Sequence, residues 1–150
     1  MNNTSNSMTK ARKIHFGVYG IYKKNESILM VQKNRGPYAG LYDLPGGSVE
    51  FSESIEHALQ REIKEETNAD MKGSRFLTNE EYQCRYVKNG EERDFHHVGI
   101  YYIVDIAVNQ LRVGFDGHDS DGAAFVPIGE ISHNTVSPIA YKALRKFLGE

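Results

Sequence analysis

Three glutamates lie within five positions of one segment of this 150-residue chain, "REIKEET": Glu62, Glu65 and Glu66. The segment is predicted to be helical, and at about 100° per residue the three carboxylates span roughly 100° of the helix circumference. Leu59 and Ile63, which such a helix should bury, fall on the same side. Like charges on one side repel each other, and buried charges need partners. The pattern therefore predicts a nearby cation.

Two kinds of cation fit the cluster. Arg61 is adjacent, but it carries a single charge and projects to one flank. A divalent ion such as Mg²⁺ or Mn²⁺ suits hard carboxylate oxygens and leaves room for water and phosphate. Gly46 and Gly47, shortly before the helix, allow the backbone to approach a ligand closely. An acidic surface helix with ordinary salt bridges is the alternative, and this helix alone leaves both interpretations open.

The composition is that of an ordinary globular protein, with 39% hydrophobic and 25% charged residues. The net charge of -2 gives no basic field that would recruit a nucleic-acid polymer. The single cysteine, Cys84, excludes an intramolecular disulfide and favours a reducing, cytoplasmic location. No apolar run reaches the roughly 20 residues of a membrane span. We expect residues 1–12 to form a flexible tail and residues 13–150 to form a single domain.

The order of predicted elements is strands, helix, strands, helix, which indicates an α/β (α+β) layered domain with a mixed sheet. The caps are predicted as follows: Ser52 as the N-cap of the acidic helix, with Glu53 in its first turn; Asn68 as its left-handed end; and Ser137 as the N-cap of the last helix. Asn89-Gly90 is a hairpin turn signal. Strands are predicted at 14–22, 28–33, 82–87, 93–106 and 123–128, and helices at 52–67 and 137–150.

The segment "GGSVEFSESIEHALQREIKEETNA" resembles the Nudix box, and it covers about a sixth of the chain. Asn68 stands in place of the final glycine of that pattern, and Ala69 in place of its final bulky apolar residue. Asn visits the left-handed conformation more readily than most residues, so this departure is tolerable. The positions that match the box in register are Gly47, Glu53, Arg61, Glu62, Ile63, Glu65 and Glu66.

This resemblance implies an α/β/α sandwich with a central mixed sheet and a catalytic loop-helix. It implies hydrolysis of a diphosphate linkage in a small nucleoside diphosphate derivative or nucleoside triphosphate, by attack of water at phosphorus. The cofactor would be Mg²⁺, with Mn²⁺ as a substitute. A homodimer is compatible with the sequence, which leaves the oligomeric state open. The metal ligands implied are Glu62, Glu65, Glu66 and a backbone carbonyl of Gly46 or Gly47, with Arg61 paired to Glu53 in a structural role.

The general base is left open by the sequence. A helix glutamate can serve, and some Nudix proteins use an acidic residue from a downstream loop. Here the polar loop at 114–122 offers Asp119 and Asp121, of which Asp121 has the better offset from Phe125. Asp and Gly also favour turns without any catalytic role.

Further polar residues are weaker candidates. His96 and His97 are consecutive in a predicted strand, so they point to opposite faces and one is expected to line a substrate cleft. Lys33 and Arg35 lie in a loop where they would contact phosphate, and Glu50 is an additional candidate metal ligand. Each of these charged residues is equally compatible with a solvated loop. The tyrosines would stack on a base or, as is usual in strands, fill the core.

Two other functions compete with hydrolysis. One is a catalytically silent module that keeps the fold and senses a nucleotide. Loss of a core glutamate would favour it, and none is lost. The other is an isoprenoid diphosphate isomerase of related fold, which would need a catalytic cysteine and a catalytic glutamate in suitable places and a longer chain. The sequence does not identify the substrate.

Overall fold

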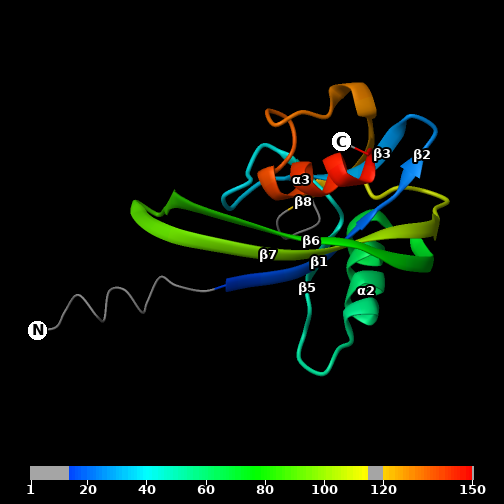
Figure 1. The fold of residues 1–150 in the computed structure, drawn as a ribbon, viewed down its shortest axis with the longest axis horizontal. Coiled ribbons are helices and arrows are strands. Elements are labelled where there is room, and N and C mark those ends of the chain that lie inside the picture. The colour runs from blue at the N-terminus through cyan, green and yellow to red at the C-terminus, as the bar shows by residue number, and fades with distance from the viewer. Residues whose placement is uncertain (1–13, 115–119, 150) are drawn as a thin grey trace, which may run out of the picture.

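The computed structural model describes residues 14–114 and 120–149, so the expected tail and Asp119 lie outside the described residues. None of the helices in these two ranges is long and apolar enough to cross a membrane. In chain order the elements are β1 (Ile14–Ile21), β2 (Lys23–Lys24), β3 (Ser27–Lys33), β4 (Tyr42–Asp43), β5 (Gly46–Ser48), α2 (Ile55–Thr67), β6 (Asp70–Lys88), β7 (Glu91–Ala107), β8 (Ser120–Pro127), the 3-10 turn η1 (Ile128–Glu130) and α3 (Pro138–Phe147) (Figure 1).

The strands form two sheets. In the first, the order is β5-β1-β7-β6, with β1 parallel to β7 and antiparallel to β5, and β6 antiparallel to β7. In the second, β3 pairs antiparallel with β2, β4 and β8. The first sheet is therefore mixed, and the predicted fold class, a mixed sheet with two helices, is confirmed.

Each of the central strands faces both helices, because successive side chains of a strand point to opposite faces. In β1, Val18 belongs to the core under α2, whereas Tyr19 and Ile21 belong to the core under α3. In β3, Leu29 likewise packs toward α2 and Met30 toward α3. The sheets thus lie between the two helices, as an α/β/α arrangement requires (Figure 1).

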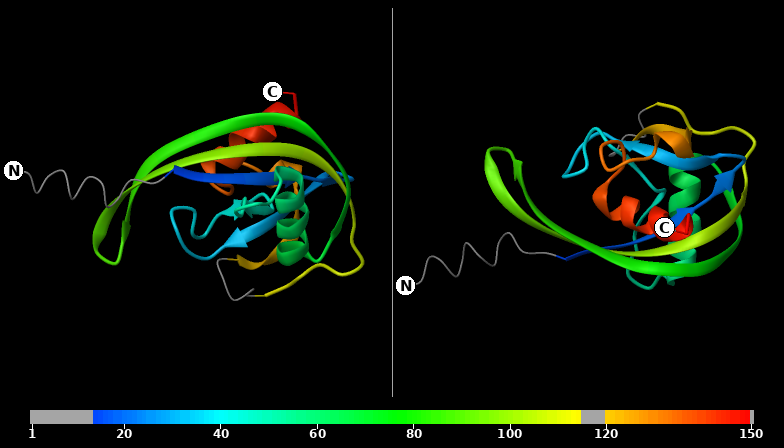
Figure 2. Two further views of the ribbon diagram at one scale, coloured as in Figure 1. Left: turned by 90° about the horizontal axis from the view of Figure 1, so that it is seen from below. Right: turned by 45° about the horizontal axis from the view of Figure 1, so that its top comes forward.

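The β6–β7 hairpin is the longest feature of the fold, and its turn projects beyond the ends of the other strands (Figure 2). The turn is formed by Asn89 and Gly90, with φ of 53° and 79°. Positive φ at both positions is what a type I′ turn needs, so the predicted turn is confirmed. The two strands are longer than the sequence indicated, because pairing along the hairpin continues from Asp70 to Lys88.

The N-cap of helix α2 lies two residues later than predicted. Its N-cap is Ser54, whose hydroxyl accepts a hydrogen bond from the Nα–H of His57 at 3.1 Å. Ser52 has a φ of 69° and lies in the turn before the helix. Glu53, predicted in the first turn, also precedes the helix, because its carboxylate accepts hydrogen bonds from Arg61 and from the backbone of Glu50. The loop geometry, which no helical pattern encodes, decides this boundary.

The other end of α2 is as predicted. Asn68 is left-handed, with φ of 66° and ψ of 18°, and its N–H donates to the carbonyl of Lys64. Its side-chain Nδ2 also donates to the carbonyl of Gln110 at 3.0 Å. Asn therefore serves both as the left-handed residue and as a tie between the helix end and the segment after β7.

Substitutions at Asn68 should separate these two roles. Asn68→Gly is expected to be close to neutral, because relief of the left-handed backbone offsets the lost contact to Gln110. Asn68→Val should destabilise the protein by about 1 kcal/mol or more, because a β-branched residue resists positive φ. Urea unfolding of the two variants measures the difference. Equal stability of the Val and Gly variants would contradict the explanation that the left-handed backbone at residue 68 causes the loss of stability.

Strand β8 begins at Ser120, earlier than predicted, because Ser120 pairs with Lys33 beyond an irregularity in the register. Asp121 therefore lies within a strand, whereas the sequence placed it in a loop.

Candidate functional site

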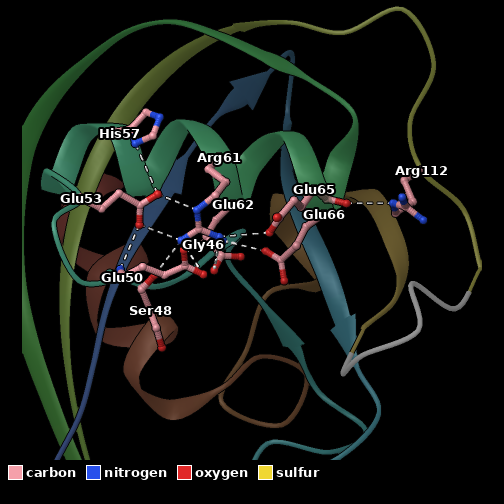
Figure 3. Close-up of polar contacts among 10 residues, drawn as sticks. All are labelled: Gly46, Ser48, Glu50, Glu53, His57, Arg61, Glu62, Glu65, Glu66 and Arg112. Atoms are coloured by element: carbon pink, nitrogen blue, oxygen red, sulfur yellow. Dashed lines mark hydrogen bonds and ion pairs between the residues drawn. The ribbon is translucent and has the colours of Figure 1, made fainter.

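Arg61 is the centre of a network of carboxylates on α2 and the loop before it (Figure 3). Its Nε and Nη2 donate to the two carboxylate oxygens of Glu53 at 2.6 and 2.9 Å, a bidentate pair. Its Nη1 lies 3.4 Å from Glu62 Oε2 and 3.2 Å from Glu65 Oε1. Nη2 also donates to the carbonyl of Ser48 at 3.1 Å. One guanidinium therefore holds the loop and two of the three clustered glutamates together.

Glu53 is the structural partner of Arg61 that the sequence predicted. Its side chain is only 7% exposed, and it also accepts a hydrogen bond from the N–H of Glu50 at 2.9 Å. The hydrogen bonds from Arg61 are the main reason that the pKa of Glu53 is lowered to about 2. The same contacts raise the pKa of Arg61 above its ordinary value. Both groups therefore remain charged over the working range of pH.

The two glycines bring the loop directly against the glutamates. The N–H of Gly46 donates to Glu66 Oε1 at 2.8 Å, and Glu66 is buried. At Gly47, a Cβ atom would lie 2.6 Å from the carboxyl carbon of Glu62, closer than real Cβ atoms approach. The observed contact of Gly46 is thus through its N–H to a carboxylate. The predicted role of a glycine carbonyl as a metal ligand stays a prediction.

A cavity of about 980 Å³ opens over this network and brings most of the predicted site residues together. Glu53 does not line it, and neither does Asp121. Its carboxylate accepts a hydrogen bond from Asn34 Nδ2 at 2.9 Å. The predicted residues on the cavity wall are Lys33, Arg35, Gly46, Gly47, Glu50, Arg61, Glu62, Glu65, Glu66 and His97.

Glu62, Glu65 and Glu66 present carboxylate oxygens on this wall, and such oxygens suit a hard divalent cation. The side chain of Glu65 is 58% exposed. Within residues 14–114 and 120–149, no three such groups are already gathered at metal-binding distance. Arg61 lies between Glu62 and Glu65 instead. A divalent ion at these carboxylates would therefore compete with Arg61 for Glu62 and Glu65, and the bidentate pair with Glu53 would keep the arginine in place.

His97, in the middle of the cavity wall, is held by two tyrosines. Tyr19 Oη lies 2.7 Å from its Nε2, and Tyr38 Oη lies 2.9 Å from its Nδ1. His97 is 1% exposed, and burial is the main cause that lowers its pKa to about 3. His96 points to the opposite face, as the strand alternation predicted. With both ring nitrogens occupied, His97 is a fixed neutral part of the wall rather than a proton acceptor.

The neutral state of His97 makes stability depend on pH. The unfolded chain takes up a proton at this residue near pH 6.5 and the folded protein only near pH 3, so acidification through this window favours unfolding. Between pH 7 and about pH 5 this residue alone should cost about 2 kcal/mol. Urea unfolding at both pH values tests this, with His97→Gln as the variant that removes the titration. Equal pH dependence in the two proteins would contradict it.

Sequence reasoning missed several polar members of the cavity wall, among them Arg112 and Asp43. Arg112 Nε donates to the carbonyl of Glu65 at 2.8 Å, so a guanidinium lies at the end of α2 beside the cluster. Asp43 is buried at the other side and accepts hydrogen bonds from the N–H of Leu44 and the hydroxyl of Ser137. Neither residue lies in a recognisable pattern. The one sequence signal that could have identified Asp43 is the presence of an aspartate in an otherwise apolar extended segment.

Comparison with known proteins gives a consistent result. The family model described as NUDIX domain matches residues 11–147. An ADP-ribose pyrophosphatase of Methanocaldococcus jannaschii is 34% identical over 106 residues, which are 69% of this chain and 58% of that protein. An 8-oxo-dGDP phosphatase of Danio rerio is 38% identical over 68 residues, 45% of this chain and 21% of that protein. The chain thus spans less than two thirds of the length of each of these curated relatives.

Solved structures share the fold at low identity. A MutT NUDIX hydrolase of Burkholderia pseudomallei superposes with a TM-score of 0.66 at 22% identity, covering 89% of this chain and 99% of that one. The NUDIX domain of NrtR from Shewanella oneidensis, solved with ADP ribose, superposes with a TM-score of 0.62 at 16% identity. That match covers 97% of this chain and 94% of the other.

Proposed function

Because the chain belongs to the Nudix family, we propose that it hydrolyses a diphosphate linkage in a nucleoside diphosphate derivative with the help of a divalent cation. The observation that carries this proposal is the meeting of Glu62, Glu65 and Glu66 with the Gly46-Gly47 turn on one wall of a large cavity. All four glutamates that match the family pattern, Glu53, Glu62, Glu65 and Glu66, are present.

Each residue of the network has a separate task in this proposal. Glu62, Glu65 and Glu66 would hold the divalent cation, Mg²⁺ or Mn²⁺, which neutralises the diphosphate and lowers the pKa of the attacking water. Arg61 restrains Glu62 and Glu65 while its bidentate pair with Glu53 fixes the loop. The N–H of Gly46 orients the buried carboxylate of Glu66. These contacts restrain the three carboxylates, and binding of the cation would displace Arg61 from Glu62 and Glu65.

Asp121 remains our proposed general base, with a glutamate of the helix as the alternative. If Asp121 removes the proton of the attacking water, Asp121→Asn lowers kcat by about 10²-fold with little change in KM or metal affinity. Asn34 donates to Oδ1 of Asp121 and leaves Oδ2 to accept a proton, so Asn34→Ala is expected to leave kcat within a few-fold. An unchanged kcat in Asp121→Asn, together with a loss in Asp119→Asn, would move the role to Asp119. If neither variant matters, the base is a helix glutamate.

A substrate panel tests the proposal as a whole. The protein is incubated with Mg²⁺, Mn²⁺ or EDTA, and each candidate is followed by chromatography of its products. ADP-ribose comes first because of the relative from Methanocaldococcus jannaschii, followed by nucleoside di- and triphosphates, dinucleoside polyphosphates and nucleotide sugars. We expect turnover of at least one member that EDTA abolishes. Tight binding of a member without turnover would instead indicate a nucleotide-sensing module.

A further inference from the structure

The first sheet carries apolar side chains that α2 does not cover. Val18 of β1 belongs to the core under α2, and Phe16, two residues earlier, points to the same side of the sheet. Phe16 is 40% exposed, and Ile14, at the start of the strand, is 64% exposed. In Figure 1, α2 lies below one part of this sheet, and β1 and β7 extend to the left beyond it. Helix α2 therefore covers only part of its own side of the sheet.

The neighbouring strands enlarge this apolar surface. Val98 of β7 pairs with Phe16, and Ile100 follows it on the same side of the sheet, where both are half-buried. Phe76 of β6 pairs with Tyr102, the next residue of β7 on that side, and is 55% exposed. Among the described residues, these exposed and half-buried side chains are members of neither core. We call the set the open face: Ile14, Phe16, Phe76, Val98 and Ile100.

The dimensions of the open face suit one helix. From Ile14 to Val18 the backbone of β1 rises roughly 13 Å, at about 3.3 Å per residue. Strands β1, β7 and β6 are consecutive in the sheet, so two strand spacings of about 4.8 Å give a width of roughly 10 Å. An α-helix with its side chains is about 10–12 Å across. Since layered domains bury a sheet face under helices, a second helix fits beside α2.

The border of the open face is acidic. Glu81 pairs with Val98, so its side chain, which is 63% exposed, points to the same side of the sheet. At the border with α2, Glu56 is exposed and accepts a hydrogen bond from Ser74, two residues before Phe76. A helix bound between these two glutamates would bring its own polar flanks close to both.

The charges farther along the hairpin keep this border acidic. Arg85 of β6 pairs with both Glu92 and Asp94 of β7, at 3.5 and 3.1 Å. His96 lies 3.8 Å from Glu81. With Glu56 included, four carboxylates exceed these two basic groups even when the histidine is protonated. A second copy of the chain would place acidic border against acidic border, and an anionic membrane would be repelled. Charge complementarity therefore favours a basic partner.

We propose that the open face binds a basic amphipathic helix of a partner protein. The apolar side of this helix packs on Phe16 and Val98, and its lysines or arginines lie against Glu81 and Glu56. Val98 follows His97, which lines the large cavity, so the open face and the cavity are on opposite sides of β7. The partner thus leaves the proposed site of hydrolysis accessible, and the inference does not depend on the proposed hydrolysis.

Two synthetic peptides of about 18 residues, long enough to form a helix, test this proposal. Both carry the same leucine stripe at helical spacing, with lysine at the polar positions of one peptide and glutamate at those of the other. Each is labelled with fluorescein, and its binding is followed by fluorescence anisotropy at low salt. The lysine peptide should bind at least about tenfold more tightly than the glutamate peptide. Added salt should reduce this difference, because the charges are exposed.

Variants of the open face locate the bound peptide. Phe16→Ser should weaken binding of the lysine peptide about tenfold, because it removes an aromatic anchor. Glu81→Lys should weaken the lysine peptide and strengthen the glutamate peptide, a reversal that loss of folding would not produce. Val113→Ser is the matched control, because Val113 is 79% exposed and bridges to Gly122 of the second sheet. It should leave the binding of both peptides unchanged, and circular dichroism confirms that each variant folds.

Equal binding of the two peptides by the unaltered protein would overturn the proposal. Lysine-peptide binding that both Phe16→Ser and Glu81→Lys leave unchanged would also overturn it, because the peptide would then bind elsewhere. Sedimentation velocity tests a second copy as the occupant, which a dimer that becomes monomeric in Phe16→Ser would indicate. If only a variant that lacks residues 1–12 binds the lysine peptide, the open face belongs to the chain's own N-terminal residues. Either of these last two results also overturns the proposal.

Discussion

Glu66→Gln should lower kcat by at least about 10²-fold and leave the fold intact, because the substitution removes one ligand charge from the proposed metal site without changing the shape of the side chain. The glutamine Oε1 can still accept the hydrogen bond from the N–H of Gly46, so the loop keeps its anchor. In EDTA the melting temperature should stay level or rise, because one of three mutually repelling carboxylates is lost. Steady-state kinetics with a Mg²⁺ titration and thermal unfolding in EDTA measure the two effects.

Glu65→Gln should show a similar loss of kcat, and Glu56→Gln provides the control on the same helix. Glu56 is exposed on the other side of α2, where its carboxylate accepts a hydrogen bond from Ser74. Its conversion to Gln should leave kcat unchanged. Normal Mg²⁺-dependent turnover in both Glu65→Gln and Glu66→Gln would refute the assignment of these residues as metal ligands.

Gly46→Ala and Gly47→Ala should fail in different ways, although the two glycines are adjacent. Gly46 has a φ of 150°, and a Cβ there would lie 2.6 Å from the Cα of Tyr19. Neither the backbone of β1 nor this dihedral can relax cheaply, so Gly46→Ala should destabilise the protein by about 3 kcal/mol or more. At Gly47 the Cβ would meet the flexible end of Glu62. Gly47→Ala should therefore displace a carboxylate and lower kcat about 10²-fold, at a stability cost near 1 kcal/mol.

Urea unfolding and kcat measured on both variants give the comparison. The informative pattern is a folded but inactive Gly47→Ala beside an unstable Gly46→Ala. If Gly47→Ala retains the kcat of the unaltered protein, then the position of Glu62 does not matter to turnover, and its role as a ligand is withdrawn. If Gly46→Ala is fully stable, the strained contact with β1 does not exist in solution.

The sequence alone was sufficient to predict the features that depend on residues close together in the chain. The shared face of Glu62, Glu65 and Glu66 follows from helical periodicity, and all three line the same cavity. The left-handed Asn68 and the Asn89-Gly90 turn were predicted because the steric preferences of single residues dominate there. The order of strands, helix, strands and helix was enough to predict the fold class, because only a small set of layered architectures is stable.

The sequence failed where a boundary depends on contacts with another element. Ser52 and Ser54 are both suitable N-caps by type, and the choice of Ser54 follows from the loop in which Glu53 folds back onto Arg61. The early start of β8 follows from its pairing with Lys33 in a distant strand. Neither contact leaves a periodic signal near the boundary that it sets.

Only the tertiary structure decided how the cavity is composed. The Tyr19–His97 and Tyr38–His97 pairs join residues 78 and 59 positions apart, and Phe95 of β7 meets Tyr38 of the loop between β3 and β4. Strand register brings such residues together, and register depends on the pairing of whole strands rather than on the identity of the residues that meet. Local spacing therefore determined the chemistry of the three glutamates, whereas long-range pairing determined the burial of His97 and the rings around it.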